Sequence, residues 1–265
     1  MEPDPTTVAA FVSARAAVLD RIATACARVG RDPLSVTLVA VSKTVDAERL
    51  RAAVAAGLTT LGENRVQEAA GKAGLVPGAT WHLVGHLQSN KVRLALDLFE
   101  TIESVDSVEL ATRLDRLAGE GFGGSGTSSA RLAGATHQAS ATARHPVFVQ
   151  VNVDEDPAKA GFRPDELPAA LPAVLALPNL EVRGLMTVGR LAPSPEVARP
   201  TFVALRELSA GLRQAMPALG AELSMGMSDD FDVAVEEGST VVRVGRALFG
   251  ERAHIHASGE PDHRP

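Results

Sequence analysis

Residues 36–43 read VTLVAVSK, and this stretch predicts a strand that is buried on both faces. It is rich in β-branched side chains, and no charge interrupts it before Lys43. A buried strand stops where the next residue must meet water, and here Ser42 and Lys43 follow. Lys43 is therefore either a surface lysine that ends a strand or an amine at the mouth of an apolar core. In the second case, partial desolvation favours the neutral amine, which is a nucleophile towards carbonyl groups.

Strands and helices alternate along the rest of the chain. Short apolar runs predict eight strands, at residues 36–41, 59–61, 80–84, 100–103, 147–151, 182–186, 222–224 and 241–244. Helical patterns fill most of the intervals and include residues 47–56, 90–98, 108–118, 165–176, 195–216 and 229–237. An additional amphipathic helix, at residues 7–30, precedes the first strand. This order predicts an α/β fold, a single closed (β/α)8 barrel of the TIM type with an extra N-terminal helix. The alternative is a doubly wound open sheet.

Composition limits the class of protein. The 265 residues are 45% hydrophobic, which is ample for one barrel domain over residues 1–265. The net charge is -6, so the chain carries no basic footprint for nucleic acid. No apolar run approaches the length of a membrane span, and the acidic N-terminus has no signal-peptide pattern. We therefore expect a monomeric cytoplasmic protein that binds neither nucleic acid nor membranes.

Residues 119–146 interrupt the alternation of strands and helices. They are rich in Gly, Ser, Ala and Thr and offer few large apolar side chains, so they predict a flexible loop. Residues 253–265 predict a flexible tail, whose histidines lack the spacing of metal ligands. Gly121, Gly123 and Gly126 match G-x-G-x-x-G, but no strand precedes them, which argues against a dinucleotide site.

Residues after the seventh and eighth expected strands suit an anion. Ser228 lies at an expected helix start, where a hydroxyl and backbone N–H groups can hold a phosphate. Gly245 lets the backbone approach a ligand closely. Plain helix capping by Ser228 and a plain turn at Gly245 are the alternatives. In a barrel these loops lie beside the end of the first strand and so beside Lys43. An amine next to a phosphate site suggests pyridoxal phosphate, whose aldehyde forms a Schiff base with lysine.

Three further polar residues lie in or after expected strands. Arg243 lies within an apolar strand and remains charged, so it needs an acceptor. That acceptor is either a pyridine nitrogen, which arginine would leave unprotonated and poor as an electron sink, or a neighbouring carboxylate. Asn64 either binds a ligand or caps the next helix. His82 is either a ligand contact or a hydrogen-bonded core histidine.

Seven motifs, which span nearly the whole chain in order, resemble those of the pyridoxal-phosphate homeostasis protein family, relatives of the N-terminal barrel of alanine racemase. The matching stretches are LVAVSKT (38–44), GENRVQE (62–68), WHLVGHLQSNK (81–91), KAGF (159–162), RGLM (183–186), LSMGMSDD (223–230) and VRVG (242–245). The resemblance implies a cofactor-handling protein in vitamin B6 homeostasis, with no catalytic residues and with apo-enzymes that need the cofactor as partners. A pyridoxal-phosphate-dependent amino-acid racemase is the alternative, although the chain has no tyrosine to act as a second base.

The resemblance also assigns roles to residues. It implies that Lys43 carries pyridoxal 5′-phosphate as a Schiff base and that Arg243 lies at the pyridine nitrogen. Ser228, Gly245 and the backbone N–H of Arg246 are expected to hold the phosphate, and Asn64 completes the cofactor-binding set. Two departures stand out in the printed sequence: Arg246 replaces a small hydroxyl residue, and His86 replaces a proline. A backbone contact to phosphate survives the first change, whereas a hydroxyl contact does not.

Overall fold

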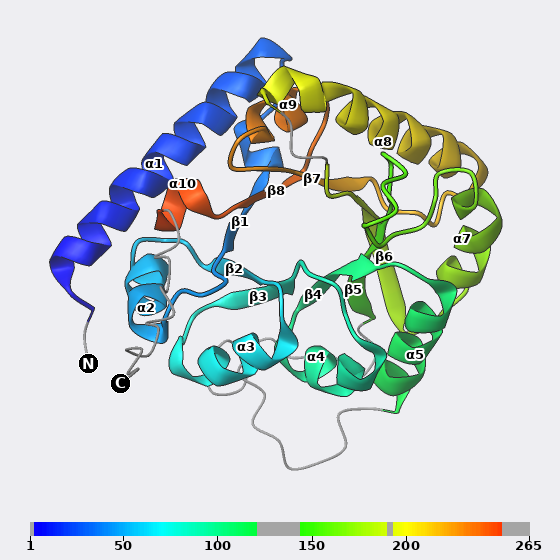
Figure 1. The fold of residues 1–265 in the computed structure, drawn as a ribbon, viewed down its shortest axis with the longest axis horizontal. Helices are drawn as coiled ribbons and strands as arrows, with labels where there is room; N and C mark the ends of the chain where they lie inside the picture. The colour runs from blue at the N-terminus through cyan, green and yellow to red at the C-terminus, as the bar shows by residue number, and fades with distance from the viewer. Residues whose placement is uncertain (1–2, 121–143, 190–192, 251–265) are drawn as a thin grey trace, which may run out of the picture.

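The computed structural model describes residues 3–120, 144–189 and 193–250, which form a closed barrel of eight parallel strands ringed by helices (Figure 1). The strands are β1 Thr37–Val41, β2 Thr60–Glu63, β3 Thr80–Leu83, β4 Thr101–Val105, β5 His145–Gln150, β6 Leu180–Met186, β7 Glu222–Met227 and β8 Val241–Val244. They follow one another around the barrel in chain order, and β1 pairs with β8 to close it. The predicted (β/α)8 barrel is confirmed, and the open sheet is wrong.

The helices lie outside the strands (Figure 1). They are α1 Pro5–Arg28, α2 Ala47–Ala55, α3 Val66–Lys72, α4 Val92–Leu98, α5 Val108–Gly119, α7 Leu167–Leu175, α8 Pro195–Ala215, α9 Phe231–Glu236 and α10 Arg246–Phe249. Short 3₁₀ turns occur at Pro33–Ser35, Ala73–Leu75 and Ser89–Lys91. The sequence patterns did not single out α3 or α10, although they did indicate the similarly short α4 and α9. Among the described residues, no helix has the combination of length and apolar character that crossing a membrane demands.

Two predicted segments fall largely outside the described residues. Of the expected loop at 119–146, residue 119 ends α5 and residues 145–146 begin β5, while 121–143 are not described. The expected tail at 253–265 lies wholly outside the described ranges. The strand boundaries differ from the predicted ones by up to three residues, since β7 extends to Met227.

Apolar side chains on the strands pack on both faces of the barrel. The larger core lies between the barrel wall and the helices. A smaller cluster fills the inside of the barrel and contains Val39, Val84, Phe148, Met186 and Val241. At Gly62 the interior is full, since a Cβ there would lie 2.8 Å from Val39 Cγ1. This packing closes the inside of the barrel below its carboxyl-terminal mouth.

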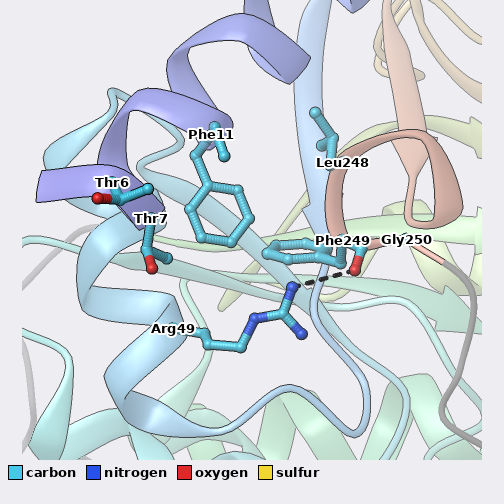
Figure 2. Close-up of a pocket in the computed structure, with 8 residues that line it drawn as sticks. Thr6, Thr7, Phe11, Arg49, Leu248, Phe249 and Gly250 are labelled. Atoms are coloured by element: carbon cyan, nitrogen blue, oxygen red, sulfur yellow. Dashed lines mark hydrogen bonds between the residues drawn. The ribbon is translucent and has the colours of Figure 1, made fainter. Parts of the chain in front are cut away.

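The extra N-terminal helix braces the short helix that follows β8. Phe11 of α1 meets Phe249 of α10 edge to face, with ring centroids 5.5 Å apart. Arg49 of α2 donates to the Phe249 carbonyl at 3.2 Å and lies over the Phe11 ring (Figure 2). Thr6 and Thr7 complete the rim of the surface hollow between these elements. Through these contacts, α1 and α2 fix the position of the segment that begins at Gly245.

A bulge in β7 shapes the loop that follows it. The register with β8 shifts between Ser224, which pairs with Val241, and Met227, which pairs with Arg243. Gly226 lies within the bulge at a φ of 93°. A Cβ at Gly226 would lie 2.6 Å from the Cβ of Ala234, so α9 packs directly against the strand.

Replacing Gly226 by alanine should therefore destabilise the protein by about 2–4 kcal/mol, because positive φ and overpacking both disfavour a side chain. The measurement is the free energy of unfolding in urea. Gly211→Ala is the matched control: its Cβ would meet open space within the described chain, and alanine suits a helix better than glycine does. Equal stability of Gly226→Ala and the wild type would contradict this account of the bulge.

Candidate functional site at the barrel mouth

Lys43 lies just beyond the carboxyl end of β1. Val41 packs against the cluster inside the barrel, whereas Ala40 packs in the outer core. The Ser42 hydroxyl is also on the outer side, where it donates to Glu63 Oε1 at 2.7 Å. Lys43 follows two residues after Val41, in the turn beyond the end of β1, and is half-buried. The amine therefore follows the last inward-facing valine of β1.

Gly245 lies against the end of the same strand. β1 and β8 pair in register, with Val39 opposite Arg243 and Ala40 opposite Val244. A Cβ on Gly245 would lie 3.3 Å from the Val41 carbonyl oxygen, a tight contact, so glycine keeps the two backbones close here. The register thus places the backbone N–H of Gly245 two residues from Lys43 across the strand pair.

Ser228 and Gly245 meet directly. The Gly245 N–H donates to Ser228 Oγ at 3.1 Å. Because the oxygen accepts this bond, the Ser228 hydroxyl hydrogen can be donated to another acceptor. The expectation that Ser228 starts a helix is wrong. α9 begins at Phe231 with Asp230 as its N-cap, and Asp230 Oδ1 accepts the Met227 N–H at 2.6 Å to shape the turn.

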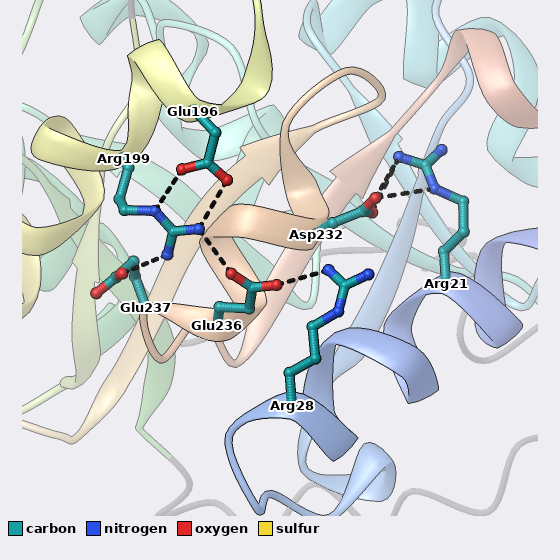
Figure 3. Close-up of polar contacts among 7 residues, drawn as sticks. All are labelled: Arg21, Arg28, Glu196, Arg199, Asp232, Glu236 and Glu237. Carbon is teal, nitrogen blue, oxygen red and sulfur yellow. Dashed lines mark hydrogen bonds and ion pairs between the residues drawn. The ribbon is translucent and has the colours of Figure 1, made fainter.

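Arginines from two neighbouring helices hold α9 in place (Figure 3). Arg21 of α1 donates to Asp232 Oδ2 at 2.9 Å, and Arg28 of α1 donates to Glu236 at 2.8 Å. From the other side, Arg199 of α8 donates to Glu236 at 2.7 Å. These ion pairs clamp the helix that directly follows Ser228 between α1 and α8.

Arg243 is buried inside the barrel below this turn. One terminal nitrogen donates to Ser224 Oγ at 2.5 Å and the other to the Thr187 carbonyl at 2.6 Å. Glu103 Oε2 lies 4.0 Å from the guanidinium. Burial lowers the pKa of Arg243, and the nearby carboxylate of Glu103 opposes that effect. The predicted salt bridge to a carboxylate is therefore present, and the two named hydrogen bonds use only two of the five guanidinium N–H groups.

Glu103 connects Arg243 with His82 across the barrel. Its Oε2 accepts the Ser224 hydroxyl at 2.6 Å, and its Oε1 lies 2.7 Å from His82 Nδ1. Burial acts to raise the pKa of this fully enclosed carboxyl, but His82, Arg243 and Ser224 together hold it below its usual value. His82 is thus a hydrogen-bonded core histidine. Glu103 was not among the predicted site residues, although a charged residue inside an apolar strand indicates a buried polar contact.

Other predicted site residues have distinct surroundings. Asn64 follows β2 and does not cap α3, whose N-cap is Arg65. Its backbone fills the space beside Gly85, where a Cβ would lie 2.4 Å from the Asn64 carbonyl oxygen. Arg246 is more than half exposed and pairs with Asp229, the residue after Ser228. The Arg246 side chain thus turns towards the β7 loop, while its backbone opens α10.

A second polar cluster, which the sequence analysis missed, lies on the outer side of β1 and β2. Lys72 of α3 contacts Glu63 at 2.9 Å and Glu68 at 2.8 Å. Burial raises the pKa of Glu63. The pair at positions 68 and 72 has helical i,i+4 spacing, and recognition of α3 would have revealed it. Within the described ranges, no group of three or more His, Cys, Asp or Glu side chains is placed to hold a metal ion.

The mouth of the barrel fits a phosphorylated aromatic aldehyde. The Ser228 hydroxyl, whose oxygen accepts the Gly245 N–H, can donate its hydrogen to an anion beside the glycine cradle at Gly245. Lys43 offers an amine just beyond the end of β1, and Arg243, opposite Val39 on β8, offers a buried donor deeper in the barrel. One anion site, one amine and one deep cation are the groups that pyridoxal phosphate requires.

We predict that Glu103→Gln will lower the free energy of unfolding by at least about 2 kcal/mol, because it removes the carboxylate facing a buried guanidinium. Urea unfolding measures the loss. The control is Glu120→Gln, which breaks the exposed pairs with Arg93 and Arg116 and should change stability by no more than about 1 kcal/mol. If the free energy of unfolding falls by no more than about 1 kcal/mol in both variants, the Glu103 carboxylate does not stabilise the buried Arg243.

The chain is similar, over most of its length, to one family model and to curated proteins that share one name. Residues 15–253 match the family model described as alanine racemase, N-terminal domain. The pyridoxal phosphate homeostasis protein of Pseudomonas aeruginosa is 41% identical over 89% of this chain and 94% of its own length. The protein of the same name from Escherichia coli is 37% identical over 89% of this chain and 94% of its own length.

Solved structures agree with the sequence relatives. PipY of Synechococcus elongatus, solved with pyridoxal phosphate bound, is 40% identical and superposes with a TM-score of 0.71 over 88% of this chain and all of its own. An alanine racemase of Clostridium difficile is 14% identical with a TM-score of 0.61, and the match covers 88% of this chain and 59% of that chain. The second likeness shows a shared barrel fold alone.

Proposed function

This chain belongs to the pyridoxal phosphate homeostasis protein family, and we propose that it binds pyridoxal 5′-phosphate at the barrel mouth and serves the intracellular homeostasis of that cofactor. One observation carries the proposal. The Gly245 N–H and the Ser228 hydroxyl meet beside the end of the strand that leads to Lys43. Relatives named for pyridoxal phosphate homeostasis at 34–41% identity support the same conclusion.

Lys43 supplies the amine. When bound, pyridoxal phosphate supplies an aldehyde that condenses with a primary amine to form a Schiff base and water. Lys43 follows Val41, the last inward-facing residue of β1, and is half-buried at the end of that strand.

The phosphate-binding groups come from the ends of β7 and β8. The Ser228 hydroxyl and the Arg246 N–H hold the phosphate. Gly245 leaves room for it and orients the Ser228 hydroxyl through its N–H, and the clamp on α9 keeps Ser228 in place. Because the Arg246 side chain pairs with Asp229, its contribution comes from the backbone, and the replacement of a small hydroxyl residue leaves that contact intact. Asn64 borders the mouth from the end of β2.

Arg243 holds the inner end of the cofactor. Its guanidinium is oriented by Ser224 and Thr187 and has further N–H groups to donate to a ring nitrogen. Arginine keeps its own protons, so a ring nitrogen that accepts from it remains unprotonated. This arrangement suits retention of the cofactor better than electron withdrawal during catalysis.

The racemase alternative has less support. A racemase needs a second base, and because the chain contains no tyrosine, His82 and His86 are the candidates. The curated relatives match over more than nine-tenths of their own length, which supports a single barrel domain for residues 1–265. We further propose that the protein acts as a cytoplasmic monomer and supplies the cofactor to apo-enzymes that need it.

Lys43→Ala and Lys43→Arg should both abolish the visible absorption band that appears when wild-type protein is mixed with pyridoxal phosphate. Alanine removes the amine, and arginine retains the positive charge without forming a stable Schiff base. Absorption spectra before and after borohydride reduction measure the effect. A visible band and a reducible adduct that persist in both variants would assign the cofactor to another lysine.

Ser228→Ala should weaken binding of pyridoxal phosphate by about 1–3 kcal/mol, because a hydrogen bond to a charged group is lost. Gly245→Val should weaken it more, since the added side chain would fill the space beside Val41. Titration calorimetry measures both affinities, with Ser13→Ala on the exposed face of α1 as the control. Unchanged affinity in both site variants would refute this phosphate site.

A further inference from the structure

Lys43 lies in a tight turn with an unfavourable backbone conformation. The Val45 N–H donates to the Ser42 carbonyl at 3.0 Å, so Lys43 and Thr44 are the two central residues of the turn. Thr44 has a φ of 66°. A positive φ at this position is characteristic of a type II turn, where glycine or asparagine is usual. A β-branched residue is disfavoured there, so the surroundings must stabilise the turn.

Side chains from β2 and α3 bind the turn on both sides of Lys43. On one side, Lys72 Nζ donates to the Ser42 carbonyl at 3.1 Å, and the Ser42 hydroxyl donates to Glu63 Oε1 at 2.7 Å. On the other side, the Thr44 N–H donates to Glu68 Oε1. Each of these bonds ends on a residue that is the immediate neighbour of Lys43 in the chain.

Lys72 holds this cluster together. Its ammonium contacts Glu63 and Glu68 as well as the Ser42 carbonyl, which matches the three N–H donors of a lysine. The Glu63 side chain is completely buried, and those of Lys72 and Glu68 are 12% and 25% exposed. Burial acts to raise the pKa of Glu68, but Lys72 and the Thr44 N–H lower it overall. Without Lys72, two carboxylates would face each other with little water between them.

We propose that Glu63, Glu68 and Lys72 are positioning residues that hold the turn in the shape that directs the Lys43 amine into the barrel mouth. They lie on the outer side of β1 and β2, whereas the phosphate-site residues Ser228 and Gly245 come from β7 and β8. The cluster therefore acts on Lys43 through the backbone. This inference rests on the proposed function, because it assigns these residues to Schiff-base formation by Lys43.

Two ligands separate this role from a general structural one. Pyridoxal phosphate uses both the phosphate site and the Lys43 amine. Pyridoxamine phosphate has the same ring and phosphate but carries an amine in place of the aldehyde, so it cannot condense with lysine. A displaced Lys43 turn should therefore weaken binding of the aldehyde and leave binding of the amine form nearly unchanged.

The test uses Lys72→Met and Glu68→Leu in the full chain. Each should weaken pyridoxal phosphate binding about tenfold or more, as expected when hydrogen bonds to charged groups are lost. Each should change binding of pyridoxamine phosphate by no more than about twofold. Titration calorimetry gives both affinities, and the visible band measures Schiff-base formation separately.

Two rescue variants make the test specific. Glu68→Gln keeps an acceptor for the Thr44 N–H and should retain most of the wild-type affinity. Thr44→Gly in the Glu68→Leu background should restore much of the lost affinity, because glycine adopts positive φ without steric cost. Arg116→Met, which removes the i,i+4 pair with Glu120 on α5, is the matched control and should bind both ligands as the wild type does.

The outcomes are distinguishable. Equal weakening of both ligands, or no weakening of either, would overturn the positioning role while the wild-type spectrum still supported the proposed function. Failure of Thr44→Gly to rescue Glu68→Leu would also contradict it. If wild-type protein itself gave no visible band with pyridoxal phosphate, the proposed function would fail and this inference with it. Should Lys72→Met not fold, the Glu68 and Thr44 variants carry the test alone.

Discussion

The pairing of β1 with β8 is the constraint on which the site depends. These strands are the first and last in the barrel, and their register sets Gly245 against the Val41 carbonyl. Barrel closure thereby brings the segment that leads to Lys43, near the start of the chain, beside the contact of Ser228 with Gly245 near its end. The bulge at Gly226 completes the arrangement, because it carries Ser228 to the Gly245 N–H. An open sheet of the same strands would separate these groups at opposite edges.

Two polar networks lie on opposite faces of the barrel wall. The inner one runs from His82 through Glu103 and Ser224 to Arg243, and it fixes a buried cation beneath the mouth. The outer one, centred on Lys72, is hydrogen-bonded to both neighbours of Lys43 in its turn. Because the inner network orients the Arg243 guanidinium and the outer one holds the backbone of the turn, the two make separable contributions. The arginine clamp on α9 adds a third support, for the phosphate turn.

The barrel and its mouth were predictable from sequence because apolar runs indicate buried strands and the polar residues after them indicate where the strands end. The eight strands and the nearness of Ser228 to Gly245 follow from strand ends in a closed barrel. The expectation that a helix starts at Ser228 was wrong. Asp230 Oδ1 accepts the Met227 N–H, and α9 begins only at Phe231. Patterns within one short segment of sequence do not show which oxygen accepts a given backbone N–H, and so they do not fix the residue at which the helix begins.

The networks themselves could not be derived from spacing. Glu103 and Arg243 are 140 positions apart, and only the closed barrel places them 4.0 Å from each other. The cluster around Lys72 stayed hidden for a different reason. α3 was not recognised in the sequence, so nothing there indicated that Glu68 and Lys72 lie together against Glu63.

The most direct measurement is peptide mapping by mass spectrometry after wild-type protein is loaded with pyridoxal phosphate and reduced with borohydride. Reduction fixes the cofactor to whichever amine formed the Schiff base. The account predicts a single modified site at Lys43, with Lys72, Lys91 and Lys159 unmodified. Modification at one of those three lysines instead, or no covalent adduct at all, would contradict it.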